Sequence, residues 1–374
     1  MRTCTFSKGY AMTKQLYFAY GSNLNIDDFE QWCVDRGYPT QLLKSVGNAS
    51  LRDYELAFSY DSASRGGGVL DLRERRGSIV PGVIFEVAEE GWDALDRKEG
   101  APGCYQREDV IVFDEFGEMH RATTYRVVDS RAEYYVEPAP GYVEVVQQGL
   151  QAWKIDDAYL LAAANNESPV FTDAIFVYGT LMRGESRFDV LKQFGIECSL
   201  LAEAQGQLFD LGLFPGMTRE CASESYVDGE FIRLRNPEAA LAALDRIEGF
   251  RGYGKPGSLY RRELIPVHVG DGRIRTAWTY CLDASADDAQ VILSGDWRKH
   301  CGTRERFMRW LANAHSDKHP RRIAERLASK SPYSWNSDRE ATVAELLPLD
   351  DALASGTLSE RKLAQTTGEW AIVP

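Results

Sequence analysis

The chain has 374 residues, of which 44% are hydrophobic and 26% are charged. This length allows two sizeable hydrophobic cores, and the composition is that of a folded globular protein rather than a long disordered chain. The formal net charge of −13 argues against a nucleic-acid binder or a protein of anionic membrane surfaces, because phosphate-rich partners attract positive surfaces. We therefore expect a small molecule as the partner, with no nucleic acid and no membrane.

The seven cysteines include no C-x-x-C pair, which argues against a disulfide framework and a zinc site and favours a reducing, cytoplasmic location. Residues 1–15 lack the apolar run of a secretory signal, and no stretch approaches about 18 consecutive apolar residues. We expect residues 1–15 to be a leader outside the fold.

The first predicted elements are a buried strand and a helix. The strand "YFAY", residues 17–20, ends in Gly21-Ser22-Asn23, and apolar spacing predicts a helix over residues 26–36. Alternating strands such as "YELAFSY" (54–60) follow, and then a helix that carries "LDRKEG" (95–100). Residues 108–128 predict a hairpin, because the turn residues 115–117 divide them.

The same order of elements returns later in the chain. It comprises "IFVYGTLMR" (175–183), a helix over residues 188–194, "GEFIRL" (229–234), "LDRIEG" (244–249) and a hairpin divided at residues 270–272. A repeat of about 150 residues is too long for a solenoid and indicates two copies of one domain. Many antiparallel strands and few helices predict an α+β fold, in which each domain is a mixed, largely antiparallel, barrel-like sheet with flanking helices.

We place the first domain at residues 16–164, a linker at 165–172, the second domain at 173–301 and a C-terminal extension at 302–374. The extension matches neither copy, and apolar spacing around residues 307–314 predicts a mainly helical tail. From Arg298 to Lys330 the sequence has ten Lys or Arg against three Asp or Glu. This basic segment is either the solvated face of a packed helix or a docking surface for an acidic protein partner.

The Glu-Gly pairs are the strongest candidates for chemistry. Glu99-Gly100 and Glu248-Gly249 each end a predicted helix, with the glycine as a left-handed stop. A carboxylate in the last turn faces the negative end of the helix dipole, which raises its pKa, as does partial burial. A raised pKa suits a carboxylic general base near neutral pH.

The Tyr-Gly turns allow two interpretations. An ordinary strand-ending turn would use the tolerance of glycine for positive φ, whereas a backbone nest would direct N–H groups at a carboxylate or an oxyanion. Tyr105 and Tyr260, which follow the Glu-Gly pairs, either orient the substrate or begin a strand with an exposed hydroxyl. The histidines form no H-E-x-x-H motif, and no Gly-x-Ser-x-Gly elbow or phosphate loop is present. We therefore expect neither a metal nor a cofactor.

Taken together, these motifs resemble a known family. The first copy resembles γ-glutamylcyclotransferases through "YGSNL" (20–24), "GGG" (66–68), "GVIFEV" (82–87), "LDRKEG", Tyr105 and "PAPGYVEVVQQGLQAW" (138–153). The second copy is similar to the γ-glutamylamine cyclotransferase and AIG2-like branch through "FVYGTLMRGESRF" (176–188), "GQLFDLGLFPGM" (206–217), "LDRIEG", "LYRRE" (259–263) and "SGDWR" (294–298).

The resemblance implies a reaction in which the free α-amine of a γ-glutamyl group attacks its own γ-carbonyl and releases 5-oxoproline with a free amine or amino acid. It implies that Glu99 and Glu248 take the proton from the α-ammonium and deliver one to the leaving nitrogen. The substrate-binding residues that it implies are Tyr20, Gly21, Ser22, Asn23, Leu24, Tyr105 and Tyr142 in the first copy, and Tyr178, Gly179, Thr180, Leu181 and Tyr260 in the second. The second copy departs from the first because it lacks "PAPGY" and has six more residues between its glutamate and tyrosine.

Two other functions fit the same motifs. One is a regulatory protein that binds a γ-glutamyl compound or 5-oxoproline without turnover. The other is γ-glutamyl transfer to an external amine, which would yield no 5-oxoproline.

Overall fold

The computed structural model describes residues 15–167, 171–212, 214–219, 225–283 and 289–302. The expected leader and the C-terminal extension with its basic segment lie almost entirely outside these residues, and both stay predictions. The chain divides into two compact units between Phe171 and Thr172.

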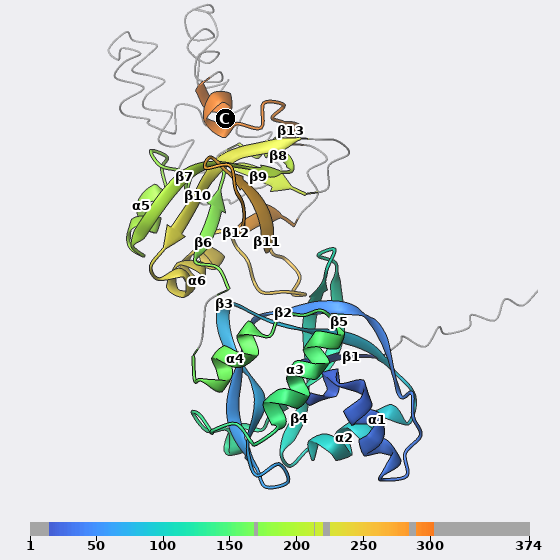
Figure 1. Cartoon of the computed structure of the whole chain (residues 1–374). Helices are drawn as coiled ribbons and strands as arrows, with labels where there is room; N and C mark the ends of the chain where they lie inside the picture. Colours follow the sequence, from blue (N-terminus) through green and yellow to red (C-terminus); the bar gives the residue numbers. More distant parts are fainter. Residues whose placement is uncertain (1–14, 168–170, 213, 220–224, 284–288, 303–374) are drawn as a thin grey trace, which may run out of the picture. The chain divides into compact units, whose positions relative to one another are not determined.

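The first unit is built on a closed five-stranded barrel (Figure 1). Its strands, in the order in which they pair, are β1 (Leu16–Ala19), β3 (Gly67–Val87), β2 (Leu43–Ser62), β4 (Tyr105–Asp114) and β5 (Met119–Val127). Strands β1 and β5 pair in parallel, and the other neighbours are antiparallel. The prediction of a mixed, largely antiparallel barrel is confirmed.

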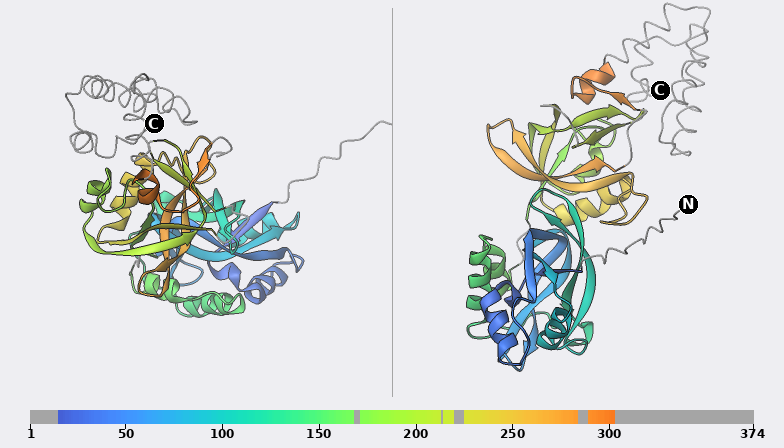
Figure 2. Two further views of the ribbon diagram at one scale, coloured as in Figure 1. Left: turned by 90° about the horizontal axis from the view of Figure 1, so that it is seen from above. Right: turned by 90° about the vertical axis from the view of Figure 1, so that its right-hand side faces the viewer.

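Helices flank this barrel. They are α1 (Ile26–Val34), α2 (Gly91–Glu99), α3 (Tyr142–Ala152) and α4 (Ala158–Ala164), with single turns of 3-10 helix at η1 (Ser22–Leu24) and η2 (Asp129–Arg131). Helices α3 and α4, coloured green, run along the outside of the barrel (Figures 1 and 2). Helix α1 ends two residues earlier than predicted, because the chain turns through Gly37 with φ 79°.

The second unit repeats the barrel. Its strands pair in the order β10 (Tyr226–Leu234), β6 (Ala174–Val177), β12 (Ile274–Leu282), β11 (Tyr260–Val269) and β7 (Ile196–Gln205), and β6 pairs in parallel with β12. Thus β6 takes the place of β1, and β12 that of β5. Helices α5 (Phe188–Lys192) and α6 (Pro237–Ile247) flank it, and α5 ends two residues before the predicted end.

The two units differ at the long hairpin that β2 and β3 form in the first unit. In the second unit the corresponding chain is divided, and the small sheet β13 (Gln290–Val291), β8 (Gln207–Asp210) and β9 (Pro215–Thr218) forms beside the barrel. The first strand of each barrel, β1 or β6, is buried. Phe18 in β1 and Phe176 in β6 are almost inaccessible to solvent. Each Tyr-Gly turn therefore begins at the end of a buried strand.

Candidate active site

Each unit holds its Glu-Gly pair at the end of a helix. Helix α2 ends at Glu99, and Gly100 follows with φ 64° and ψ 33°, a left-handed conformation that glycine adopts at little cost. Helix α6 ends at Ile247, so that Glu248 is its C-terminal cap, and Gly249 again has φ 64°. The same local sequence thus places both carboxylates directly before the turn that stops the helix.

The Tyr-Gly turns need glycine for close packing. Gly21 has φ −117°, so the first turn does not use positive φ, as an ordinary glycine turn would. A Cβ atom at Gly21 would lie 3.3 Å from the Tyr142 hydroxyl oxygen, and one at Gly179 would lie 2.6 Å from the Pro215 ring. The absence of a side chain lets other parts of each unit approach the turn.

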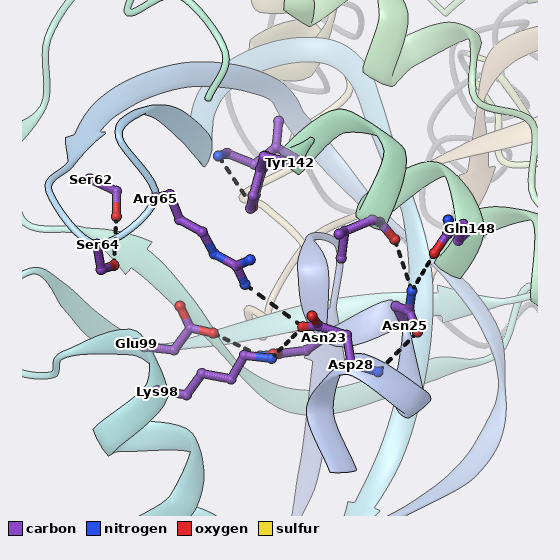
Figure 3. A network of polar contacts seen from close by, with 12 residues as sticks. Asn23, Asn25, Asp28, Ser62, Ser64, Arg65, Lys98, Glu99, Tyr142 and Gln148 are labelled. Atoms are coloured by element: carbon purple, nitrogen blue, oxygen red, sulfur yellow. Dashed lines mark hydrogen bonds and ion pairs between the residues drawn. The ribbon is translucent and has the colours of Figure 1, made fainter. Parts of the chain in front are cut away.

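In the first unit the turn and the helix end meet. The Asn23 amide Nδ2 donates hydrogen bonds to Glu99 Oε1 at 2.7 Å and to the Tyr17 hydroxyl at 2.9 Å. Asn23 is buried, and within the described part of the chain its Oδ1 atom has no hydrogen-bond partner. The Asn23 amide therefore ties the Glu99 carboxylate to the turn (Figure 3).

A cluster of charges lies beside this contact. Lys98, whose side chain is only 5% exposed, forms an ion pair of 3.0 Å with Asp28, and Arg65 approaches the same carboxylate at 3.7 Å. Figure 3 shows Arg65 reaching toward Asp28 on the side of the network where Lys98 and Glu99 lie. The cations of this cluster are thus partly neutralised by Asp28.

These surroundings act on the pKa of Glu99 in opposite directions. Burial raises the pKa, and the positive charge of Lys98, the hydrogen bond from Asn23 and the positive charge of Arg65 oppose the rise. The net effect is a pKa above the ordinary value of a glutamate. Burial also lowers the pKa of Lys98, against the influence of Asp28.

In the second unit the glutamate and the turn line one pocket. Its walls are formed by Ile175, Phe176, Val177, Tyr178, Gly179, Thr180, Leu181, Arg187, Phe214, Pro215, Leu244, Ile247, Glu248, Leu259, Tyr260 and Tyr280. Leu181 occupies the position in the turn that Asn23 has in the first unit. The repeated elements therefore form a concave site, but one with mostly apolar walls.

The loss of the amide changes the electrostatics of the second glutamate. Burial raises the pKa of Glu248 to about 7, and the positive charge of Arg187 opposes this rise. No hydrogen bond to the Glu248 carboxylate is present within the described residues. The second carboxylate therefore titrates near neutral pH, where a general base is most effective.

Some of the N–H groups of each turn are available to a ligand, and others have partners within the turn. The Leu24 N–H donates to the Gly21 carbonyl at 3.0 Å, and the Met182 N–H donates to the Gly179 carbonyl at 2.9 Å, so both are occupied. Among the described residues, no acceptor is found for the N–H groups of Gly21, Ser22 and Asn23 in the first turn, nor for those of Gly179, Thr180 and Leu181 in the second. The Leu24 side chain lies in the hydrophobic core, so Leu24 anchors the turn to the core.

Tyr105 and Tyr260 are buried where β4 and β11 begin. The Tyr105 hydroxyl donates to the Leu70 carbonyl at 2.6 Å, and the Tyr260 hydroxyl donates to the Pro215 carbonyl at 2.7 Å. The alternative of a hydroxyl at the protein surface is therefore wrong for both. Each hydroxyl joins the strand that carries it to the opposite wall of its site.

The other predicted tyrosines also have internal partners. The Tyr20 hydroxyl donates to the Tyr125 carbonyl at 2.7 Å, and the Tyr178 hydroxyl donates to the Tyr280 carbonyl at 2.6 Å, so each turn is fixed to a neighbouring strand. Tyr142, at the start of α3, packs against Gly21, and burial raises its pKa to about 12. It closes the first site from the side of α3.

Sequence reasoning missed the aspartate that stands three residues before each glutamate. Asp96 accepts hydrogen bonds from the Tyr125 hydroxyl at 2.6 Å and from Arg107. Asp245 likewise accepts a bond of 2.7 Å from the Tyr280 hydroxyl and forms an ion pair with the buried Arg262. The recurrence of this aspartate in both copies of Leu-Asp-Arg-x-Glu-Gly could have identified it from the sequence. In the structure it holds the helix that carries the glutamate against the barrel.

No group of three or more His, Cys, Asp or Glu side chains within the described residues is arranged to hold a metal ion. His315 and His319, which stand four residues apart, lie outside these residues. In the described part of the chain, no helix is long and apolar enough to cross a membrane.

Comparison with known proteins agrees with this arrangement. The family model "Gamma-glutamyl cyclotransferase, AIG2-like" matches residues 17–142 and 175–299, one segment in each unit. The chain therefore belongs to the AIG2-like gamma-glutamyl cyclotransferase family and contains two tandem copies of its domain. Both the family resemblance and the duplication that the sequence indicated are confirmed.

Two relatives known by sequence each match about one third of the chain. A Vibrio cholerae protein whose name assigns it to the gamma-glutamylcyclotransferases is 33% identical over 123 residues, which are 33% of this chain and 93% of that protein. The gamma-L-glutamyl-butirosin B gamma-glutamyl cyclotransferase of Niallia circulans is 30% identical over 132 residues, or 35% of this chain and 79% of the relative. A solved structure titled "Gamma-glutamyl cyclotransferase" is 22% identical and covers 42% of this chain and 89% of its own, with a TM-score of 0.35.

Proposed function

We propose that the chain is a γ-glutamyl cyclotransferase with two active sites, which releases 5-oxoproline and an amine or amino acid from γ-glutamyl compounds. Family membership and the names of the relatives support this class of reaction. One observation carries the assignment of the sites. In each unit a glutamate of raised pKa lies at a Tyr-Gly turn that has N–H groups without an acceptor among the described residues.

In the proposed mechanism, Glu99 or Glu248 removes a proton from the α-ammonium of the substrate. The freed nitrogen attacks the γ-carbonyl carbon, a carbon–nitrogen bond forms, and a five-membered ring with a tetrahedral centre results. The protonated glutamate then gives its proton to the leaving nitrogen as the original amide bond breaks. The ring nitrogen loses its second proton, which the released amine takes up, so that the amine leaves as an ammonium. Because the nucleophile belongs to the substrate, the protein must supply orientation and a base, and it needs no nucleophilic side chain.

The turns have the complementary role. The N–H groups of Ser22 and Asn23, and those of Thr180 and Leu181, would bind the glutamyl group, because converging backbone N–H groups suit carboxylates and developing oxyanions. Tyr142 would close the first site, and Tyr105 and Tyr260 would fix the walls opposite. We propose a cytoplasmic reaction that uses neither a metal nor a cofactor.

The test is 5-oxoproline release from a panel of γ-glutamyl amines, γ-glutamyl amino acids and glutathione. The panel is assayed with the wild type, Glu99→Gln, Glu248→Gln and the double variant, in the presence and absence of an added acceptor amine. We expect 5-oxoproline from the wild type and a different loss of substrates from each single variant. A new γ-glutamyl amide without 5-oxoproline would contradict the proposal in favour of transfer, and saturable binding without any product would favour a regulatory protein.

A further inference from the structure

Among the described residues, one cation lines the pocket of the second unit, and it forms no ion pair. Of the described residues that line this pocket, only Arg187 and Glu248 are charged. The Arg187 guanidinium has no hydrogen bond or ion pair with any other described residue, and neither has the Glu248 carboxylate. The two opposite charges share a mostly apolar pocket and yet do not form an ion pair with each other.

The backbone of Arg187 is nevertheless fixed in place. Its N–H donates to the Thr180 carbonyl at 2.8 Å, which joins Arg187 to the Tyr-Gly turn of the second unit. The next residue, Phe188, is buried and begins helix α5. Arg187 therefore lines the pocket from a segment whose backbone is held in place on both sides.

In the part of the first unit that the structure describes, the two cations near Glu99 both interact with Asp28. Arg65, which lies near Glu99, comes from the turn between β2 and β3 and interacts with Asp28 at 3.7 Å. Lys98 pairs with the same carboxylate at 3.0 Å. An arginine whose side chain has no partner among the described residues is thus a feature of the second site.

We propose that Arg187 binds the α-carboxylate of the γ-glutamyl group and is the residue that makes the second site selective for a free α-amino acid head. This inference rests on the proposed function, because the role of Glu248 there is to accept the proton of the α-ammonium. The α-carboxylate is bonded to the same carbon as that ammonium, so a ligand placed against Glu248 offers a carboxylate within the same pocket. A planar guanidinium binds a carboxylate through two parallel hydrogen bonds, with specific geometry.

The arrangement also explains why the two charges are left apart. A zwitterionic head supplies an ammonium for Glu248 and a carboxylate for Arg187, so both protein charges gain partners when the substrate enters. If the guanidinium paired with Glu248 instead, it would stabilise the ionised carboxylate and weaken it as a base. Separation of the two groups therefore preserves the base and provides a recognition site.

The test uses the full chain in a Glu99→Gln background, so that turnover reports the second site. Arg187→Gln and Arg187→Lys are assayed on a γ-glutamyl amine and on the same compound with its α-carboxylate converted to a carboxamide. Arg187→Gln should raise KM for the free acid about 10- to 100-fold, the effect of losing a hydrogen bond between charged groups. The KM for the carboxamide should change little, and Arg187→Lys should restore part of the loss for the free acid. An equal loss for both compounds would overturn the proposal.

Two further controls separate binding of the α-carboxylate from an effect on the pKa of Glu248 and from binding of a carboxylate on the leaving group. Arg187 lowers the pKa of Glu248, so each variant is compared on the high-pH plateau of its own rate profile. A second pair of substrates differs in whether the leaving group has a carboxylate. If the effect of Arg187→Gln follows the leaving-group carboxylate and not the α-carboxylate, the assignment is wrong.

A binding measurement decides the role of Arg187 without turnover. The protein with Glu99→Gln and Glu248→Gln is titrated calorimetrically with 5-oxoproline and with neutral 5-oxoprolinamide. Arg187→Gln in this background should weaken one binding event for 5-oxoproline and leave binding of the amide unchanged. Equal weakening of both ligands would overturn the inference. Failure of the wild type to release 5-oxoproline from any substrate would instead contradict the proposed function, and the two results are distinguishable.

Discussion

The Asn23 amide donates a hydrogen bond of 2.7 Å to the Glu99 carboxylate, whereas Leu181, at the same place in the second turn, lines the pocket beside Glu248 and can donate none from its side chain. One position in a duplicated motif therefore sets two different environments for the same acid. A hydrogen bond to the ionised carboxylate lowers its pKa, and an apolar neighbour leaves the effect of burial unopposed.

The first prediction concerns the pH profile of the first site. Asn23→Leu, in a Glu248→Gln background, removes a contact that lowers the pKa of Glu99. Because the base must be ionised to act, the acidic limb of kcat/KM for 5-oxoproline release should move to higher pH. The reciprocal variant Leu181→Asn, in a Glu99→Gln background, should move the limb of the second site to lower pH. An unchanged limb in both variants would show that this position does not tune the base.

The second prediction concerns stability. The folded pKa of Glu248, about 7, lies above the ordinary value of 4.5, so the folded state binds the proton more tightly than the unfolded state. The contribution of Glu248 to wild-type stability should therefore be fully present at pH 4 and be lost as the pH rises from about 4.5 to about 7. Glu248→Gln avoids this loss and should be more stable than the wild type at pH 8 by about 3 kcal/mol, and by much less at pH 5.

Thermal unfolding at the two pH values measures this difference. Glu144→Gln, which changes an exposed glutamate, is the matched control and should show no such dependence. A Glu248→Gln protein that is equally or less stable than the wild type at pH 8 would show that the carboxylate is not held in an unfavourable environment.

The third prediction compares the helix anchors of the two units. Arg262 is fully buried and pairs with Asp245 at 3.3 Å, whereas Arg107 and Asp96 pair at 2.7 Å with side chains that are 41% and 37% exposed. Asp245→Ala leaves a buried cation without its carboxylate and should cost about 3–5 kcal/mol. Asp96→Ala loses an exposed pair and one hydrogen bond and should cost about 1–2 kcal/mol. Urea denaturation of both variants checks the order, and equal costs would contradict it.

The fourth prediction concerns the glycines of the turns. A methyl group at Gly179 would meet the Pro215 ring at 2.6 Å, so Gly179→Ala must displace the turn or the pocket wall. At Gly21 the nearest atom is the Tyr142 hydroxyl oxygen at 3.3 Å, and a small shift accommodates the methyl group. Activity of the second site should therefore fall more in Gly179→Ala than activity of the first site in Gly21→Ala, each assayed with the other site silenced. The reverse order would contradict this account of the packing.

The sequence predicted the elements that are determined locally. A glycine after Leu-Asp-Arg-x-Glu stops a helix whatever the rest of the chain does, so the positions of Glu99 and Glu248 followed from the repeat itself. The barrels followed from strand alternation and the hairpin turns. The duplication strengthened both predictions, because chance patterns do not return in the same order.

Features that depend on distant residues were not predictable. The hydroxyls of Tyr105 and Tyr260 are directed inward because Leu70 and Pro215 offer carbonyls from other strands, and no local pattern reveals such partners. The division of the second hairpin into β7 and β8 is another case. Arg187 has no ion-pair partner among the described residues, because the fold brings no carboxylate into contact with its guanidinium. Sequence spacing does not reveal such an absence.

The most direct test of the central claim is the initial rate of 5-oxoproline release from a γ-glutamyl amine by the wild type and by the Glu99→Gln, Glu248→Gln double variant at pH 8. Thermal unfolding of both proteins verifies that the double variant is folded. The account predicts release by the wild type and a rate lower by about 10²- to 10⁴-fold in the double variant, which is the usual contribution of a general acid–base residue. A folded double variant that releases 5-oxoproline as fast as the wild type would contradict it.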